Sequence, residues 1–252
     1  MRADLARLDA GKEFAYASID KIFKSDLQMQ RKTQGIVVRG GGKTLIVPIT
    51  SDRGLCGGIN SGLIREIKYK ITHSANRANF NIFTIGEKGT SALLRPFPEL
   101  MRGSISEVAT PLNFPTCCSI GQQLSIVSQG YDKIVIFFNQ FQSAIKSEVR
   151  EMELHPREKF LEFMKHMKLY KKPLPDKNSM SPALYDLYIS SNVYHAYLNN
   201  LASEQSARMT AMENASKNAK ELAEKLRLEY NKARQAKITM ELVEIISGAA
   251  AV

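Results

Sequence analysis

The stretch Leu45–Ser61, L-I-V-P-I-T-S-D-R-G-L-C-G-G-I-N-S, places a glycine-rich turn between an apolar run and a segment typical of a helix. A strand, a glycine-rich turn and a helix are also the parts of a phosphate-binding loop. Both sequence signatures of such a loop are absent, because no lysine ends the turn and the G-x-G-x-x-G spacing fails. The stretch therefore predicts a sharp strand-to-helix turn, in which glycines supply backbone freedom and Asn60 or Ser61 caps the helix.

Cys56 lies in this turn and supports an alternative hypothesis, in which the chain is a small α/β enzyme with Cys56 as its nucleophile. Arg53 is a cation of the kind that stands beside reactive cysteines. No histidine lies within the loop to act as a base, although a residue distant in sequence could supply one. A structural turn is favoured, and no catalytic residue is assigned.

Residues 35–154 alternate between strand-like and helix-like patterns, which predicts an α/β fold with a Rossmann-like, mostly parallel open sheet. The run K-I-V-I-F-F-N at 133–139 is typical of a strand that is buried on both faces. Residues 155–180, rich in proline and lysine, are interpreted as a surface linker. Strands are expected over 43–50, 80–85, 105–110, 133–139 and 143–154, and helices over 60–74, 87–94 and 116–129.

Residues 181–252 are interpreted as one long helix. No proline or glycine interrupts the 65 residues between Pro182 and Gly248, and a helix of that length would extend about 100 Å. Small or apolar residues recur at alternating spacings of four and three, which is typical of a coiled coil. An amphipathic helix lying on the α/β domain is the less favoured alternative, because a compact domain is too small to cover it. The recurring positions are Tyr194, Leu198, Leu201, Met212, Ala215, Ala219, Leu222, Leu226, Ala233 and Ala236, with Gln205, Arg208 and Glu229 between them.

A coiled coil needs a second helix, and residues 1–25 are the candidate within this chain. A helix of about 22 residues reaches only about 33 Å. Most of the long helix therefore requires a partner from another chain or from residues that precede Met1.

The net charge of +10 lies entirely before Ser181, where 27 basic residues outnumber 17 acidic ones. A basic body favours an acidic partner, and nucleic acid is one possibility. Against nucleic acid, the chain lacks interleaved aromatic residues and a basic recognition helix. We expect no membrane span, no metal and no cofactor, because no apolar run approaches 18 residues and no Cys/His metal spacing occurs.

Two blocks carry a family resemblance. One is the loop Ser51–Ser61, and the other is S-E-Q-S-A-R-M-T-A-M-E-N-A-S-K-N-A at Ser203–Ala219 with R-Q-A-K-I-T-M-E-L-V-E-I-I-S-G-A-A-A at Arg234–Ala251. Together they resemble the gamma subunit of the F-type ATP synthase, and the tail is closest to mitochondrial members. The resemblance implies a long antiparallel coiled coil built from the N- and C-terminal helices. It also implies that about the first 35 residues of the N-terminal helix are absent.

The resemblance implies roles for five residues of the C-terminal helix. Arg208 matches an arginine that faces acidic loops of the catalytic beta subunits, and Arg234 and Gln235 match residues that hydrogen-bond a beta-subunit loop. Ile245 and Ile246 belong to an apolar end that the family encloses in a sleeve of alpha and beta subunits. The implied function is a non-catalytic rotor shaft, which couples rotation of the membrane ring to conformational change in the beta subunits.

The resemblance also assigns a foot to the shaft, the α/β domain. It implies that this foot meets the membrane c-ring and the small central-stalk subunits, delta or epsilon, and we expect Asp52 and Arg53 to make polar contacts there. The implied location is peripheral, on the matrix side of the mitochondrial inner membrane, within a hetero-oligomer.

Overall fold

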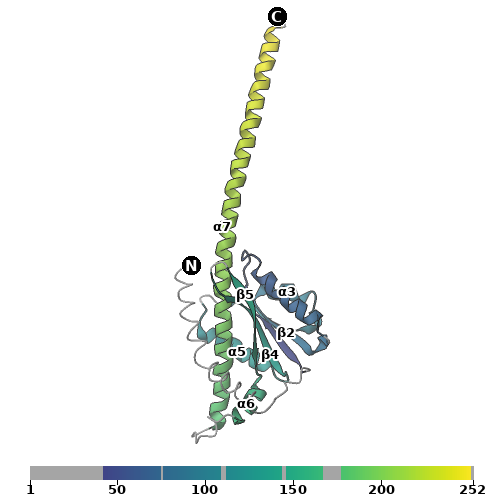
Figure 1. Ribbon diagram of the computed structural model, residues 1–252, viewed down its shortest axis with the longest axis vertical. Helices are drawn as coiled ribbons and strands as arrows, with labels where there is room; N and C mark the ends of the chain where they lie inside the picture. Colours follow the sequence, from purple (N-terminus) through teal and green to yellow (C-terminus); the bar gives the residue numbers. More distant parts are fainter. Residues whose placement is uncertain (1–41, 75, 109–111, 144–145, 167–176, 251–252) are drawn as a thin grey trace. The chain divides into compact units, whose positions relative to one another are not determined.

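The computed structural model describes residues 42–74, 76–108, 112–143, 146–166 and 177–250 (Figure 1). The chain divides between Arg208 and Met209 into two compact units. The described residues of the first unit are called the body, and residues 209–250 are called the tail. The elements are β1 (Thr44–Pro48), α3 (Ile59–Thr72), a 3-10 turn (Arg77–Asn79), β2 (Phe80–Ile85), α4 (Glu87–Leu94), a second 3-10 turn (Pro98–Leu100), β3 (Met101–Ile105), α5 (Phe114–Val127), β4 (Lys133–Phe141), β5 (Ser147–Leu154), α6 (Arg157–His166) and α7 (Lys177–Ala250).

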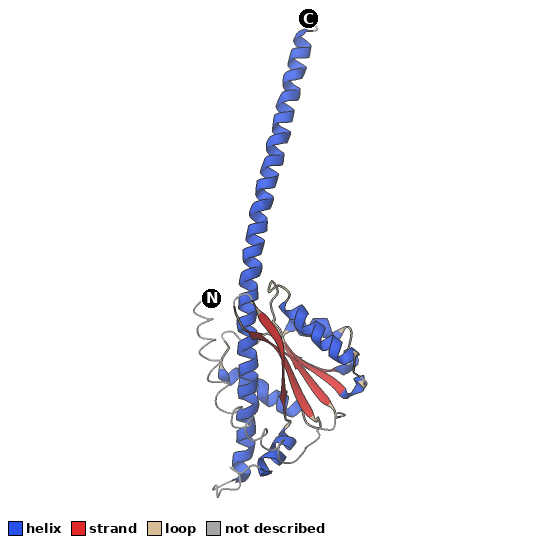
Figure 2. Ribbon diagram, viewed as in Figure 1, coloured by secondary structure: helices blue, strands red, loops and turns tan. Residues whose placement is uncertain are grey.

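The body holds one five-stranded sheet with the strand order β3-β2-β1-β4-β5. Figure 2 shows the strands of this sheet in red between helices. The pairs β1–β2, β1–β4 and β2–β3 are parallel, and β5 returns antiparallel to β4. The predicted α/β class with a mostly parallel open sheet is therefore confirmed. One strand was misplaced, since the strand expected over 105–110 lies at Met101–Ile105. Its sequence M-R-G-S-I contains a glycine and an arginine, and such residues weaken a strand signal at a sheet edge.

Both faces of the sheet are buried, because successive side chains of its central strands enter different cores. Along β1, Leu45 and Val47 belong to one hydrophobic core and Ile46 to the other. Helices α3 and α4 cover the face of Ile46, and α5, α6 and the start of α7 cover the opposite face (Figure 1). On α3 the buried stripe consists of Leu63, Ile64, Ile67 and Ile71, the spacing of an amphipathic helix.

Helix α6 lies within the region that was interpreted as a linker. Its Phe160 is buried and stacks on Tyr188 of α7 with 4.9 Å between ring centroids. Tyr185 lies beside the same ring at 5.3 Å. Phe160 and the half-buried Leu161 pack into the core on this face of the sheet, so α6 contributes to the core.

The tail is the later part of α7, a helix of 74 residues that begins at Lys177. A long C-terminal helix is therefore confirmed. In the tail, Leu222 and Leu226 of the predicted heptad are 57% and 55% exposed. The proposed second helix, residues 1–25, lies outside the described residues, and the coiled coil stays a prediction. Among the described helices, none is both long enough and apolar enough to cross a membrane.

Candidate functional site

The loop after β1 turns sharply at two residues with left-handed backbone angles. Leu55 has a φ of 62° and a side chain that is 73% exposed, and Gly57 has a φ of 60°. The predicted glycine freedom is therefore used at Gly57, whereas Gly58 has an ordinary φ of −88° and precedes the first residue of α3. The second left-handed residue, a leucine, was not predicted, because such residues seldom adopt this conformation.

Asn60 does not cap α3 as predicted, because its side chain turns back into the loop. Its Oδ1 accepts a hydrogen bond from Ser51 N at 3.2 Å, and its Nδ2 donates to Ser51 Oγ at 2.6 Å. The start of α3 has no side-chain cap. The side-chain amide of Asn60 instead holds Ser51, the first residue of the loop, in place.

Cys56 is 3% exposed, and its environment is that of a packed residue. Its Sγ accepts a hydrogen bond from Asn60 Nδ2 at 3.2 Å and lies 3.5 Å from Ser51 Oγ. The same sulfur donates to the backbone oxygen of Arg53 at 3.9 Å. None of these partners is a general base, so the arrangement favours the structural role of Cys56 over the nucleophile hypothesis.

Asp52 is held by backbone groups of its own chain. Its Oδ1 accepts a hydrogen bond from Glu87 N, the first residue of α4, at 3.0 Å, and its Oδ2 accepts from Val108 N at 3.3 Å. A carboxylate at this position satisfies a free N–H group at the start of the helix. The side chain of Arg53 is exposed and its backbone oxygen accepts a hydrogen bond from Ser51 Oγ at 2.8 Å.

Polar side chains of α7 occupy the place where open α/β sheets usually bind ligands, beside the carboxyl ends of strands at a reversal of strand order. In this sheet the reversal lies between β1 and β4. Near the end of β4, Asn139 Nδ2 donates to Asn200 Oδ1 at 2.9 Å, and Asn139 N donates to the same oxygen at 3.3 Å. Ser203 Oγ donates to Asn139 O at 3.1 Å. The chain's own helix therefore fills this position.

Glu204 and Arg208 form an ion pair one turn further along α7, with Arg208 Nη2 2.5 Å from Glu204 Oε1. The two side chains are only 12% and 19% exposed. Burial raises the pKa of Glu204, and the Arg208 guanidinium partly opposes that rise. The negative charge of Asp52 raises the same pKa and the positive charge of Arg53 lowers it.

Three of the seven predicted contact residues, Asp52, Arg53 and Arg208, carry charges that influence the pKa of Glu204. The guanidinium of Arg208 already has a partner within the body. The other four predicted residues lie in the tail, where Ile245 and Ile246 are 72% and 58% exposed and the side chains of Arg234 and Gln235 are exposed as well.

Sequence reasoning missed Glu204, Asn139 and Asn200 as parts of this site. One signal was present, because Asn200, Ser203 and Glu204 recur at helical spacing between buried apolar residues of α7. Polar residues on a buried helix stripe require hydrogen-bond partners. The position of Asn139 within an apolar strand was a second signal.

Comparison with known proteins agrees with this architecture. The ATP synthase family model matches residues 3–252. The ATP synthase gamma chain of Geobacter metallireducens is 37% identical over 213 residues, which are 82% of this chain and 72% of that protein. The gamma chain of Clostridium novyi is 33% identical over 252 residues, or 94% of this chain and 83% of that protein. Among solved structures, the central stalk and c-ring of the Tetrahymena thermophila mitochondrial ATP synthase contains a chain with a TM-score of 0.75 and 40% identity, covering 85% of this chain and 93% of that one.

An α/β body with a mostly parallel sheet and a long C-terminal helix is the fold of a central-stalk subunit. The chain belongs to the ATP synthase gamma-chain family.

Proposed function

We propose that the chain is a non-catalytic rotor shaft, which couples rotation of a membrane ring to conformational change in the catalytic beta subunits. One observation carries this proposal, namely that the tail exposes large apolar side chains along its length. Soluble monomers rarely expose apolar surface on this scale, so the tail requires an enclosing protein. The exposed residues are Met212, Leu222, Leu226, Leu228, Tyr230, Ile238, Met240, Leu242, Val243, Ile245 and Ile246.

The proposed mechanism is rigid-body switching. A shaft without symmetry presents a different face to each of three beta subunits, so each subunit favours a different conformation. Turning the shaft exchanges those faces and hence the nucleotide affinities. In this proposal Arg234 and Gln235 contact a beta-subunit loop, because an arginine fork pairs well with carboxylates.

Arg208 requires a more specific proposal, because Glu204 already binds its guanidinium. We infer that an acidic beta-subunit loop competes with Glu204 for Arg208. The Glu204–Arg208 pair would then open only while a beta-subunit loop lies close enough to bind Arg208.

The proposed lack of catalysis rests on two features of the body. The usual ligand position of the sheet is filled by Asn200 and Ser203, and the thiol of Cys56 has no base among its described partners. Alpha and beta subunits, the small delta or epsilon stalk subunits and the c-ring are the proposed partners. Asp52 and Arg53 are proposed to meet the foot partners.

The proposed location is the matrix side of the mitochondrial inner membrane. The 40% identity to the Tetrahymena mitochondrial chain exceeds the identities to the two bacterial chains, 37% and 33%. Fractionation of mitochondria with an antibody against this chain would test the location. Recovery in the soluble cytoplasm rather than with inner membranes would contradict it.

Rotation is tested by changing Ile245 and Ile246 to lysine within an assembled ATP synthase. Lysine would place charge where the proposal requires apolar surroundings, so ATP hydrolysis should fall by about tenfold, which corresponds to about 1.4 kcal/mol in the barrier. The matched control, Asn214→Lys with Asn218→Lys, adds the same charge at exposed polar positions of the tail. Equal hydrolysis rates in the Ile245/Ile246 variant and the wild type would refute the proposal that this end of the tail turns in apolar surroundings.

A further inference from the structure

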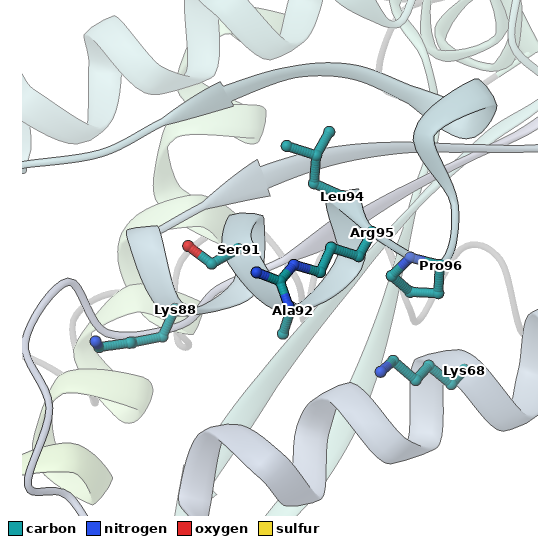
Figure 3. A pocket seen from close by; sticks show the side chains of 7 residues that line it. All are labelled: Lys68, Lys88, Ser91, Ala92, Leu94, Arg95 and Pro96. Carbon is teal, nitrogen blue, oxygen red and sulfur yellow. The ribbon is translucent and has the colours of Figure 1, made fainter.

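A shallow basic pocket lies between α3 and α4, on the sheet face opposite α5 (Figure 3). Its cavity volume is about 870 Å³. Most of its lining side chains are exposed, so the pocket is open to solvent. The lining residues are Lys68, Lys88, Ser91, Ala92, Leu94, Arg95 and Pro96.

Three cations of this α3–α4 pocket, Lys68, Lys88 and Arg95, are uncompensated. In the part of the chain that the structure describes, none of them pairs with a carboxylate, whereas the nearby Lys70 pairs with Glu151. Like charges held together without a counter-charge favour an anionic partner.

The carboxylate that lies near the pocket on α4 does not neutralise these cations. Glu87 Oε1 accepts a hydrogen bond from Ser91 Oγ at 2.7 Å, and Glu87 is not among the lining residues. Lys88 is fixed at its backbone, because Lys88 N donates to Ser51 O at 3.1 Å. This hydrogen bond joins the start of α4, which carries Lys88, to the loop after β1.

The pocket also has an apolar side, formed by Ala92, Leu94 and Pro96. Leu94 is 49% exposed although it belongs to the apolar residues of α4. A free phosphate would use the cations and leave this side uncovered. Small ligands are also usually enclosed on most of their surface, which an open pocket does not provide. The combination suits an extended segment that carries both carboxylates and an apolar side chain.

We propose that the α3–α4 pocket binds an acidic segment of a partner protein. Carboxylates of the segment pair with Lys68, Lys88 and Arg95, and an apolar side chain between them packs on Leu94 and Pro96. Arginine suits this role because its planar fork matches a carboxylate. A lipid surface would contact protruding cations and has no side chain to fill a recess. The proposal holds whether or not the chain turns as a rotor.

The test uses the full-length chain and a fluorescein-labelled peptide, Asp-Glu-Leu-Asp-Glu, with binding measured by fluorescence anisotropy at about 50 mM salt, where screening is modest. The variant Lys88→Glu with Arg95→Glu should weaken binding by at least about tenfold, because two attractions become repulsions. The control, Lys146→Glu with Arg157→Glu, makes the same charge change outside the pocket and should alter binding by less than about twofold. Replacing the peptide's leucine by serine should also weaken binding several-fold.

Three results would overturn the proposal. Equal weakening in the two charge-reversal variants would mean unspecific attraction to a basic chain. If tripolyphosphate displaces the peptide, and replacing the peptide's leucine by serine leaves its affinity unchanged, the pocket is a simple anion site. Binding to phosphatidylglycerol vesicles without binding to the peptide would mean a lipid contact. All four substituted residues are exposed, so both variants should fold. Melting curves of the two variants check this.

Discussion

Helix α7 passes through two different environments, and the same sequence pattern runs through both. In the body, Leu198 of the heptad is 3% exposed, and its neighbours Val193 and Ala196 are fully buried. In the tail, Leu222 and Leu226 continue the heptad spacing and remain exposed. Periodicity thus identifies the apolar face of a helix without indicating whether the chain itself or a partner covers it. Substitutions at matched positions in the two regions separate these cases.

The largest difference is expected for large-to-small changes. Phe137 of β4 is 1% exposed in the core under α3, and Phe137→Ala should destabilise the isolated chain by about 3–5 kcal/mol through the cavity that it leaves. Leu226→Ala in the tail should change stability by less than about 0.5 kcal/mol. Urea unfolding measures both values. A comparable loss for Leu226→Ala would show that the isolated chain covers its tail.

Buried amides provide the second contrast. Asn200→Ala removes the oxygen that accepts both hydrogen bonds from Asn139, and a buried unpaired amide costs about 1–3 kcal/mol. Asn218→Ala removes the same side chain from an exposed position of the same helix and should be nearly neutral. Urea unfolding again measures the difference. Similar stabilities for the two variants would mean that water or another side chain replaces Asn200.

The foot loop gives a smaller effect, which also distinguishes an internal role of Asp52 from a contact role. Asp52→Ala removes the acceptor of Glu87 N and Val108 N and should cost about 0.5–2 kcal/mol, in the range of a lost helix cap. Arg53→Ala should leave the stability of the isolated chain within about 0.5 kcal/mol. If Asp52→Ala has the melting temperature of the wild type, these hydrogen bonds contribute nothing to stability. A contact with a partner would then be the remaining role for Asp52.

The smallest effect concerns pH. Burial raises the pKa of Glu204 in the folded chain above its ordinary value of 4.5, so the folded chain binds this proton more tightly than the unfolded chain. The stability from this group is present at low pH and is lost as pH rises from the unfolded pKa through the raised folded pKa. When the pH is lowered from 7 to 5, the melting temperature of the wild type should therefore rise relative to that of Glu204→Gln.

Glu221→Gln is the matched control for this pH effect. Glu221 lies in the tail and is exposed, with its Oε1 3.9 Å from Lys217 Nζ. It is also one member of an i,i+4 ion pair, although here the base precedes the acid, the reverse of Glu204 and Arg208. Its substitution should leave the pH dependence unchanged. A melting difference of the opposite sign for Glu204→Gln would mean that Arg208 outweighs burial and depresses the pKa.

The sequence was sufficient to predict the α/β class and most elements, because apolar runs with a period of two or 3.6 reflect burial directly. The strand over Phe80–Ile85 and the helix over Glu87–Leu94 have the predicted bounds. The strand at Met101–Ile105 was displaced in the prediction because an edge strand needs only a weak apolar pattern. Helix α6 was not predicted, because the nearby prolines and charges outweighed one buried phenylalanine.

The contacts of the site were less predictable than the fold. The partners of Asp52 are backbone N–H groups at positions 87 and 108, and nothing in the local sequence indicates which backbone a carboxylate will meet. The pairing of Arg208 with Glu204 follows from i,i+4 spacing and could have been predicted. The effect of Asp52 and Arg53 on the pKa of Glu204 could not be predicted, because these residues are distant in sequence.

The change of environment within α7 has a consequence for hydrogen exchange. In the isolated chain, amide protons of the buried stretch near Val193–Ser203 would exchange only when the sheet opens, at a rate set by global unfolding. Amide protons beyond Met212 would exchange through local fraying, because a solitary helix is marginally stable in water. One continuous helix would thus contain a slowly deuterated segment in the body and a rapidly deuterated segment in the tail. A partner that binds the tail would be recognised because it slows hydrogen exchange there.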